Sequence, residues 1–168
     1  RRIKISNTVL ITGSAGFVGF HLAQTFLSKK WKVVGFDAMS NYYDVNLKKD
    51  RHSILEKNSQ FIAYTGLIQN EKLLNEVYER HKPNIIIHLA AQAGVRYSID
   101  NPISYVESNL VGTFRILELA RKHKPKHLLM ASTSSVYGSN IDMPLHENQK
   151  SDTPISFYAA TKKSNEAM

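Results

Sequence analysis

The sequence predicts an α/β fold in which helices cover both faces of a doubly wound parallel sheet, giving three layers, α/β/α. Short apolar runs alternate along the chain with longer segments whose apolar residues recur at helical spacing. One run, Asn84–Leu89, is almost continuously apolar, as is typical of a strand buried on both faces of a parallel sheet. A glycine-rich turn, Thr12–Gly19, joins the first run to the first helical segment. Such a sheet binds its ligand at the carboxyl ends of its strands.

The first half of the chain is expected to form three strands and three helices. The strands are expected over Thr8–Ile11, Lys32–Phe36 and Gln60–Tyr64. The helices are expected over Phe17–Leu27, over a short piece around Leu47–Leu55 within a polar loop, and over Asn70–His81. Pro83 ends the last of them, because proline cannot continue a helix.

The second half is expected to add two strands, Asn84–Leu89 and His127–Ala131. A long helix is expected over Ser104–Lys122, and Pro125 follows its end. Its buried stripe is predicted to consist of Val106, Leu110, Thr113, Leu117 and Ala120. Ser139–Thr153 is predicted to be a polar loop, and a further helix begins at Ser156 and continues to Met168.

Composition narrows the class of protein. The 168 residues are 42% hydrophobic, include no cysteine, and contain no apolar run near the roughly 18 residues that cross a membrane. We therefore expect one domain over residues 1–168, without disulfides or a membrane contact, in a reducing cytoplasm. No signal peptide is recognised at Arg1, and the missing initiator methionine indicates a trimmed start.

The net charge of +8 raises the possibility of a nucleic-acid partner. However, the basic residues are spread from Arg1-Arg2 to Lys162-Lys163, and no nucleic-acid motif accompanies them. An anionic small substrate or a solvated basic face explains the charge as well, so we expect no nucleic acid. We also expect no metal site, because no cysteine is present and Pro125 keeps His123 and His127 off one helical face.

The glycine-rich turn has the features of a site for the phosphates of a dinucleotide. Its glycines are spaced G-x-x-G-x-x-G, one residue longer at the front than the common pattern. Gly13 would permit a tight turn, Gly16 a close backbone approach to the pyrophosphate, and Gly19 close packing of helix on strand. The helix N-terminus would present free N–H groups to the phosphates. A strand–helix turn without any ligand is the alternative.

Asp37 ends the second predicted strand, at about the 20-residue spacing from the glycines where a carboxylate binds the adenine-side ribose. A carboxylate there accepts hydrogen bonds from both ribose hydroxyls and repels a 2′-phosphate. The position therefore favours NAD over NADP. A helix or loop cap is the alternative role for Asp37.

Tyr158 and Lys162 form a Y-x-x-x-K pattern and share one face of the last predicted helix. A free tyrosine has a pKa of about 10, and a nearby ammonium favours its phenolate. A phenolate can take the proton of a sugar hydroxyl while hydride leaves the same carbon. The segment Met130–Gly138 adds hydroxyl groups after a buried strand. The alternative for the Tyr158–Lys162 pair is an amphipathic helix with a solvated lysine. The alternative for Met130–Gly138 is a polar turn.

Taken together, the motifs resemble those of the extended short-chain dehydrogenase/reductase family, which has a Rossmann fold. The resemblance rests on T-G-S-A-G-F-V-G at 12–19, Asp37, H-L-A-A-Q at 88–92, Asn109, S-T-S-S-V-Y-G at 132–138 and Y-A-A-T-K at 158–162. Within that family the chain is similar to nucleotide-sugar 4-epimerases, most of all those of UDP-glucuronate. Three segments carry this finer resemblance: Asn41–Asp44 together with Leu47-Lys48, Ala91–Ser98, and Tyr158–Glu166.

The resemblance implies a role for each matching residue. It implies that the pyrophosphate is cradled by Gly13, Gly16, Phe17, Val18 and Gly19. Asp37 would bind the adenosine ribose. The nicotinamide half would be lined by Leu89, Ala90, Ala91 and Gln92. Tyr158 would be the base, and Lys162 its partner and a ligand of the nicotinamide ribose. Thr133 would be the catalytic hydroxyl residue, with Ser134 as the neighbouring candidate.

The implied activity is NAD-dependent epimerisation of a UDP-sugar by transient oxidation at C4, and the implied assembly is a homodimer. The chain departs from the family at Leu67, where an aspartate usually contacts adenine, and at Ala38, which replaces a frequent asparagine. Family members are roughly twice as long, so the resemblance implies that the C-terminal substrate domain is absent and that the chain stops within the helix of Tyr158. A 4,6-dehydratase, a UDP-glucose 4-epimerase and a truncated NAD-binding protein without catalysis are the alternatives.

Overall fold

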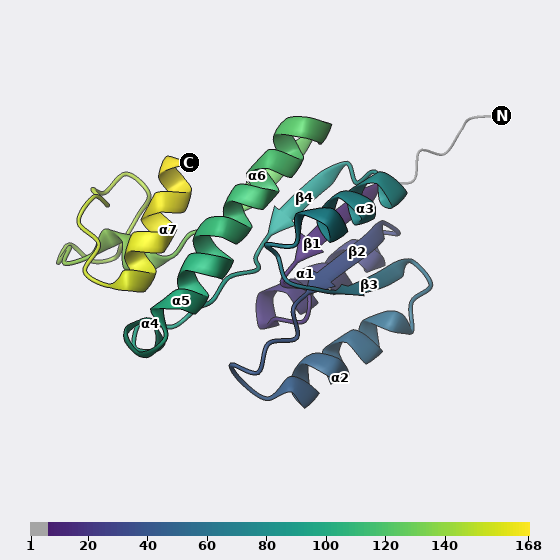
Figure 1. Cartoon of the computed structure of the whole chain (residues 1–168), viewed down its shortest axis with the longest axis horizontal. Coiled ribbons are helices and arrows are strands. Elements are labelled where there is room, and N and C mark those ends of the chain that lie inside the picture. The colour runs from purple at the N-terminus through teal and green to yellow at the C-terminus, as the bar shows by residue number, and fades with distance from the viewer. Residues whose placement is uncertain (1–6) are drawn as a thin grey trace.

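The computed structural model of the chain describes residues 7–168, and these form one parallel sheet with helices around it (Figure 1). The basic pair Arg1-Arg2 lies outside the described residues. The strands are β1 (Thr8–Thr12), β2 (Lys32–Asp37), β3 (Phe61–Thr65), β4 (Ile85–His88) and β5 (His127–Met130). All neighbours pair in parallel in the order β3-β2-β1-β4-β5. The chain therefore reverses its direction of winding between β1 and β4, which is where such sheets bind ligands.

Helices cover both faces of the sheet, as predicted. The longer ones are α1 (Phe17–Ser28), α2 (Val45–Glu56), α3 (Glu71–His81), α6 (Gly112–His123) and α7 (Phe157–Ala167). The α1 and α2 side buries an apolar cluster that includes Ala23, Leu27 and Leu55. The α3 and α6 side buries another that includes Leu74, Val77 and Ile116. The strands supply alternate residues to the two clusters, as the pleat requires: Val9 and Ile11 to the first, Leu10 to the second.

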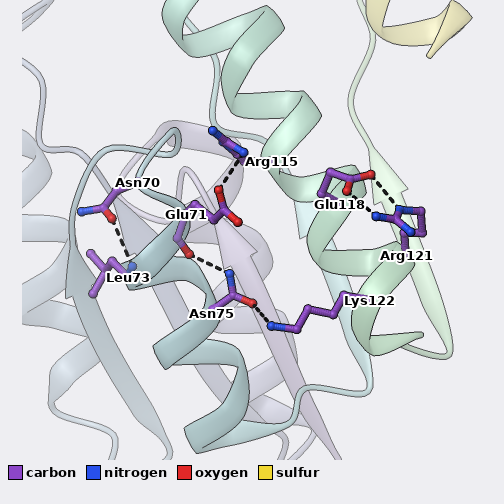
Figure 2. Close-up of polar contacts among 8 residues, drawn as sticks. All are labelled: Asn70, Glu71, Leu73, Asn75, Arg115, Glu118, Arg121 and Lys122. Carbon is purple, nitrogen blue, oxygen red and sulfur yellow. Dashed lines mark hydrogen bonds and ion pairs between the residues drawn. The ribbon is translucent and has the colours of Figure 1, made fainter.

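Polar contacts fasten α3 to α6 at the protein surface (Figure 2). Arg115 pairs with Glu71 at 2.7 Å, and the Nζ of Lys122 donates to the side-chain oxygen of Asn75 at 3.0 Å. Farther along α6, Arg121 pairs with Glu118 at 2.6 Å. Part of the positive charge noted in the sequence is thus matched by acidic neighbours on these two helices.

The predicted long helix is present but contains an irregular turn. It comprises α5 (Pro102–Tyr105), a π-helical turn, η1 (Val106–Val111), and α6, and a short helix α4 (Tyr97–Asp100) precedes it. The predicted buried stripe was wrong at every position except Thr113. The buried residues are instead Tyr105, Asn109, Gly112, Thr113, Ile116 and Leu119. Ile116 and Leu119 pack into the apolar cluster on the α3 and α6 side, whereas Tyr105 and Asn109 hydrogen bond with the loop after β4.

The last helix, α7, lies away from the β1–β3 side of the sheet, beside α4, α5 and η1 (Figure 1). Ser156 caps it by accepting a hydrogen bond from the backbone N–H of Ala159 at 3.0 Å. A 3₁₀ turn, η2 (Ser134–Tyr137), follows β5 and also contacts α7. Within residues 7–168, no helix combines the length and apolar character needed to cross a membrane.

Candidate functional site

A cleft of about 300 Å³ opens where β1, β2 and β4 end. It brings together seven of the residues that the sequence assigns to a cofactor: Gly13, Gly16, Asp37, Leu89, Ala90, Ala91 and Gln92. Leu67 and Ala38, the two departures from the family pattern, also line it. The cleft therefore lies at the topological switch point of the sheet, as the fold predicts.

The glycine turn is shaped by close backbone contacts. Gly13 has φ +74°, a conformation that side chains with a Cβ rarely adopt, and its N–H donates to the carbonyl oxygen of Phe36 at 2.7 Å. A Cβ on Gly13 would lie 2.9 Å from the backbone nitrogen of Ala90. A Cβ on Gly19 would overlap the carbonyl oxygen of Gly13. Gly13 thus lets the turn approach the end of β4, and Gly19 lets helix α1 approach the turn.

Phe17 and Val18 lie at the first positions of α1, where backbone N–H groups have no helical partner. Their side chains are 67% and 61% exposed and belong to a shallow hollow on α1, not to the cleft. Any contact that they make with a pyrophosphate would come from the backbone. Their assignment to the cradle stays a prediction.

The carboxylate of Asp37 is buried and holds the glycine turn from inside. One oxygen accepts a hydrogen bond from the N–H of Ala15 at 3.0 Å, and the other accepts one from the N–H of Met39 at 2.9 Å. Each carboxylate oxygen has further lone-pair capacity, and Asp37 lines the cleft. The residue therefore combines the loop-cap role left open by the sequence with a position suited to a ribose.

Helix α2 carries three polar residues on one face, Lys48, Arg51 and His52, and the last two support the glycine turn. The guanidinium of Arg51 donates to the carbonyl oxygen of Ala15 at 3.0 Å, and the imidazole of His52 lies 2.9 Å from the hydroxyl of Ser14. Burial lowers the pKa of His52, although the charge of Asp37 opposes the shift. Burial likewise lowers the pKa of Lys48, again against Asp37. The sequence analysis named Lys48 within the finer resemblance but missed Arg51 and His52, although the i, i+3 and i+4 spacing of the three was visible.

The loop between β2 and α2 crosses toward the opposite wall of the cleft. Lys48 anchors it by donating to the carbonyl and hydroxyl oxygens of Ser40, at 2.8 and 2.9 Å. At the far side, the ring of Tyr42 packs on the ring of Tyr97, with centroids 4.9 Å apart. Gly94, at φ +100°, leaves room for the hydroxyl of Tyr42. We call residues 38–44 the strap, because they connect the Asp37 side of the cleft to the α4 side.

A buried chain of side chains joins the ends of β1 and β4. The hydroxyl of Thr12 accepts hydrogen bonds from the N–H groups of Leu89 and Ala90, both at 3.2 Å, so its own proton goes to Nδ1 of His88 at 2.7 Å. The Nε2 of His88 then donates to Thr113 on α6 at 3.1 Å. Burial, with a smaller contribution from Lys162, lowers the pKa of His88 to about 3. This histidine is neutral and structural.

Asn109 links the cleft to α7. Its side chain accepts from the N–H of Gln92 at 2.7 Å and donates to the carbonyl oxygen of Gln92 at 3.0 Å. The same amide donates to the hydroxyl of Thr161 at 3.1 Å, and the backbone oxygen of Asn109 accepts from the amide of Asn165 at 2.8 Å. Gln92, which lines the cleft, is therefore tied to the helix that carries Tyr158.

The four residues predicted to be catalytic lie outside the lining of the cleft: Tyr158 and Lys162 on α7, Ser134 on η2, and Thr133 at the position that caps η2. The ring of Tyr158 packs edge-on against buried Tyr105, with centroids 6.0 Å apart. Lys162 is buried and donates to the carbonyl oxygen of Ala131 at 2.5 Å. Burial lowers the pKa of Lys162, and the charge of Glu166 acts in the opposite direction.

Thr133 caps the 3₁₀ turn, accepting from the N–H of Ser135 at 3.2 Å, and Ser134 beside it is exposed. Glu166 accepts from the hydroxyl of Ser132 at 2.5 Å, and Lys162 binds Ala131. These two contacts fasten the segment before Thr133 to α7. The catalytic roles of Thr133, Ser134, Tyr158 and Lys162 stay predictions. The sequence analysis did not assign roles to Tyr105, Asn165 or Glu166.

Comparison with known proteins places the chain in a family. A family model described as GDP-mannose 4,6 dehydratase matches residues 10–168. The chain belongs to this family. The finding confirms the resemblance to extended short-chain dehydrogenase/reductases and the Rossmann-type fold.

Several relatives and solved structures in the comparison are named as sugar-nucleotide 4-epimerases, and three of them are about twice as long as this chain. A probable UDP-glucuronate 4-epimerase of Rhizobium meliloti (strain 1021) is 52% identical over 159 residues, which are 95% of this chain and 47% of that protein. The Bacillus cereus UDP-glucuronic acid 4-epimerase, solved with UDP-glucuronic acid and NAD, matches with TM-score 0.87 and 34% identity, over 95% of this chain and 50% of that one. The Bifidobacterium longum UDP-glucose 4-epimerase, solved with NAD+ and UDP, matches with TM-score 0.84 and 29% identity, over 96% and 47%. The chain thus spans about half the length of these relatives.

Proposed function

We propose that the full-length protein is an NAD-dependent 4-epimerase of UDP-glucuronate or UDP-galacturonate, and that residues 1–168 are its cofactor-binding part. The observation that carries the proposal is the tie from the cleft, through Gln92 and Asn109, to the helix of Tyr158 and Lys162. This tie joins a dinucleotide-type cleft to the helix that carries a tyrosine–lysine pair. A cofactor-binding protein without catalysis would not need it.

The residues of the cleft fit NAD. The turn at Gly13 and Gly16 leaves space where any Cβ would crowd the backbone, and the N-terminus of α1 adds N–H groups suited to a pyrophosphate. Asp37 offers carboxylate oxygens to a ribose and would repel a 2′-phosphate. Leu89, Ala90, Ala91 and Gln92 would line the nicotinamide half. When bound, NAD supplies the acceptor for a hydride from C4 of the sugar and returns it.

The chain's own residues would handle the proton and the sugar oxygen. Tyr158, as a phenolate, would take the proton of the C4 hydroxyl and later give it back. The ammonium of Lys162 would favour that phenolate and hold the nicotinamide ribose. Thr133, or Ser134 beside it, would hydrogen bond the C4 oxygen both as alcohol and as ketone. Rotation of the ketone between the two transfers inverts the carbon.

The choice of substrate is supported by the relatives. The Rhizobium meliloti protein is named for UDP-glucuronate, and the Bacillus cereus structure contains UDP-glucuronic acid. A UDP-glucose 4-epimerase and a 4,6-dehydratase are the alternatives that share the fold. Identification of products by NMR after incubation of the full-length protein with UDP-glucuronate, UDP-glucose and dTDP-glucose separates these activities.

Tyr158→Phe in the full-length protein tests the mechanism. The variant removes only the phenolic oxygen, so we expect it to retain bound NAD and to lose 4-epimerisation by about 100-fold or more. Tyr137→Phe, on the 3₁₀ turn, is the matched control and should keep most of the activity. Turnover by Tyr158→Phe equal to that of the wild type would exclude the mechanism.

We also propose that the full-length protein forms a homodimer. Exposed apolar side chains follow the outer side of α4, α5, η1 and α6, namely Ile99, Ile103, Val111 and Phe114. A second copy of the same helices would cover them, as isologous dimers do. Light scattering on the full-length protein, compared with an Ile103→Lys/Phe114→Lys variant, measures the oligomeric state. A monomeric wild type would contradict the proposal.

A further inference from the structure

We propose that Asn165 and Thr161 are positioning residues that fix the helix of Tyr158 against the π-helical turn η1. The inference rests on the proposed function, because its consequence is the placement of Tyr158 at the sugar. Asn165 and Thr161 lie on the face of α7 that carries Tyr158, at i+7 and i+3 from it. Neither is needed to line the cofactor cleft.

The first anchor is the hydrogen bond from Asn165 to η1. In this turn the backbone N–H of Gly112 bonds to the carbonyl oxygen of Glu107, five residues back. This wider pattern interrupts the regular helical ladder, and a side chain can then bond to a helix carbonyl. The amide of Asn165 does so, donating to the backbone oxygen of Asn109 at 2.8 Å. Asn109 is fully buried and Asn165 is only 5% exposed, so water does not compete for the bond.

The second anchor is the hydroxyl of Thr161. It accepts from the side-chain amide of Asn109 at 3.1 Å and donates to the carbonyl oxygen of Tyr158 at 2.8 Å. The Asn109 side chain holds both the N–H and the carbonyl of Gln92 at the cleft. Two bonds, one turn apart on α7, thus set both the height and the rotation of the helix relative to the cleft.

We expect loss of these two anchors to affect the position of Tyr158 more than the cofactor cleft. The cleft is lined by β2, by the loops after β1, β2, β3 and β4, and by single turns of α2, α5 and η1, and none of its lining residues lies on α7. A small shift of α7 would move Tyr158 away from the sugar oxygen and Lys162 with it, but the bonds between Asn109 and Gln92 and the cofactor contacts of the cleft lining would stay in place. A misplacement of about 1 Å at a reacting group costs on the order of 100-fold in rate. Loss of the anchors should therefore lower kcat rather than raise KM.

The test compares variants of the full-length protein at each anchor. Asn165→Asp keeps the shape and removes the N–H donor, and Thr161→Val keeps the shape and removes the hydroxyl. We expect both to lower kcat by about 10- to 100-fold, with KM and bound NAD within about twofold of the wild type. Thr161→Ser, which restores the hydroxyl, should recover most of kcat. Ser164→Ala is the matched control, because Ser164 is a half-buried neighbour on α7 whose hydroxyl donates to the carbonyl oxygen of Ala160 within the same helix.

Three outcomes would overturn the inference. They are a kcat near that of the wild type in Asn165→Asp and Thr161→Val, a loss of kcat only in proportion to lost folding or lost NAD, and no recovery in Thr161→Ser. If the buried carboxylate of Asn165→Asp prevents folding, Asn165→Ala and the Thr161 pair provide the same comparison without a buried charge. A wild-type protein without 4-epimerase activity would instead contradict the proposed function.

Discussion

Acidification should destabilise the folded protein through His88. The folded state holds this imidazole neutral between Thr12 and Thr113, and burial lowers its pKa from 6.5 to about 3. Because the folded pKa lies below the unfolded one, the contribution of His88 is complete above pH 6.5 and is lost as pH falls from 6.5 toward 3. Each pH unit within this window costs about 1.4 kcal/mol, so by pH 5 the loss reaches about 2 kcal/mol.

The substitution His88→Asn isolates the contribution of His88 to the pH dependence of stability. The asparagine oxygen can still accept the proton of Thr12, but it does not titrate in this range. Urea unfolding of the full-length protein at pH 7 and pH 5 gives the free energy of unfolding for each form. The wild type should lose about 2 kcal/mol more than His88→Asn between the two pH values. Burial also lowers the pKa of His52 and His81, but they contribute equally to both forms. Equal losses in the two proteins would refute the reasoning.

Two further predictions concern the cleft. Gly19→Ala places a methyl group onto the carbonyl oxygen of Gly13, so we expect a loss of about 1–3 kcal/mol of stability and at least about tenfold weaker NAD binding. Thermal unfolding measures the stability, and calorimetry measures the NAD affinity. Wild-type values in both measurements would contradict the prediction. Tyr42→Ala removes the contact between the strap and Tyr97, an aromatic pair worth about 0.5–1.5 kcal/mol, so NAD should dissociate roughly 2- to 12-fold faster in a fluorescence chase. An unchanged rate would show that the strap does not retain NAD.

The elements that could be predicted are those whose side chains are apolar on the buried face. The strands of the sheet and helices α1 and α3 fall close to their expected bounds because their periodicity is unambiguous. Helix α2 is longer than the short helix expected around Leu47–Leu55, and its buried residues are Lys48, His52 and Leu55. Two of these three are polar, so a search for apolar spacing detects only part of the helix.

The error in the long helix has the same origin. Val106, Leu110, Leu117 and Ala120 recur at helical spacing, but so do Tyr105, Asn109, Ile116 and Leu119, one position away. A search for apolar residues at helical spacing ranks the first set higher, because even with Thr113, which both sets share, it contains fewer polar residues. The structure buries the second set because Asn109 finds partners in Gln92, Thr161 and Asn165. Such partners are distant in sequence and leave no local signal.

The candidate site shows the same division between local and distant information. Motif spacing located Gly13, Asp37 and the Tyr158–Lys162 pair, because each depends on a short stretch of chain. It could not show that Asn109 and Asn165 join the two parts of the site, since these residues meet across 56 positions. A polar residue buried within a helix is costly unless it is hydrogen bonded, so its presence indicates a specific partner. Asn109 and Asn165 are therefore better guides to how this cleft and helix α7 are aligned than the apolar residues around them.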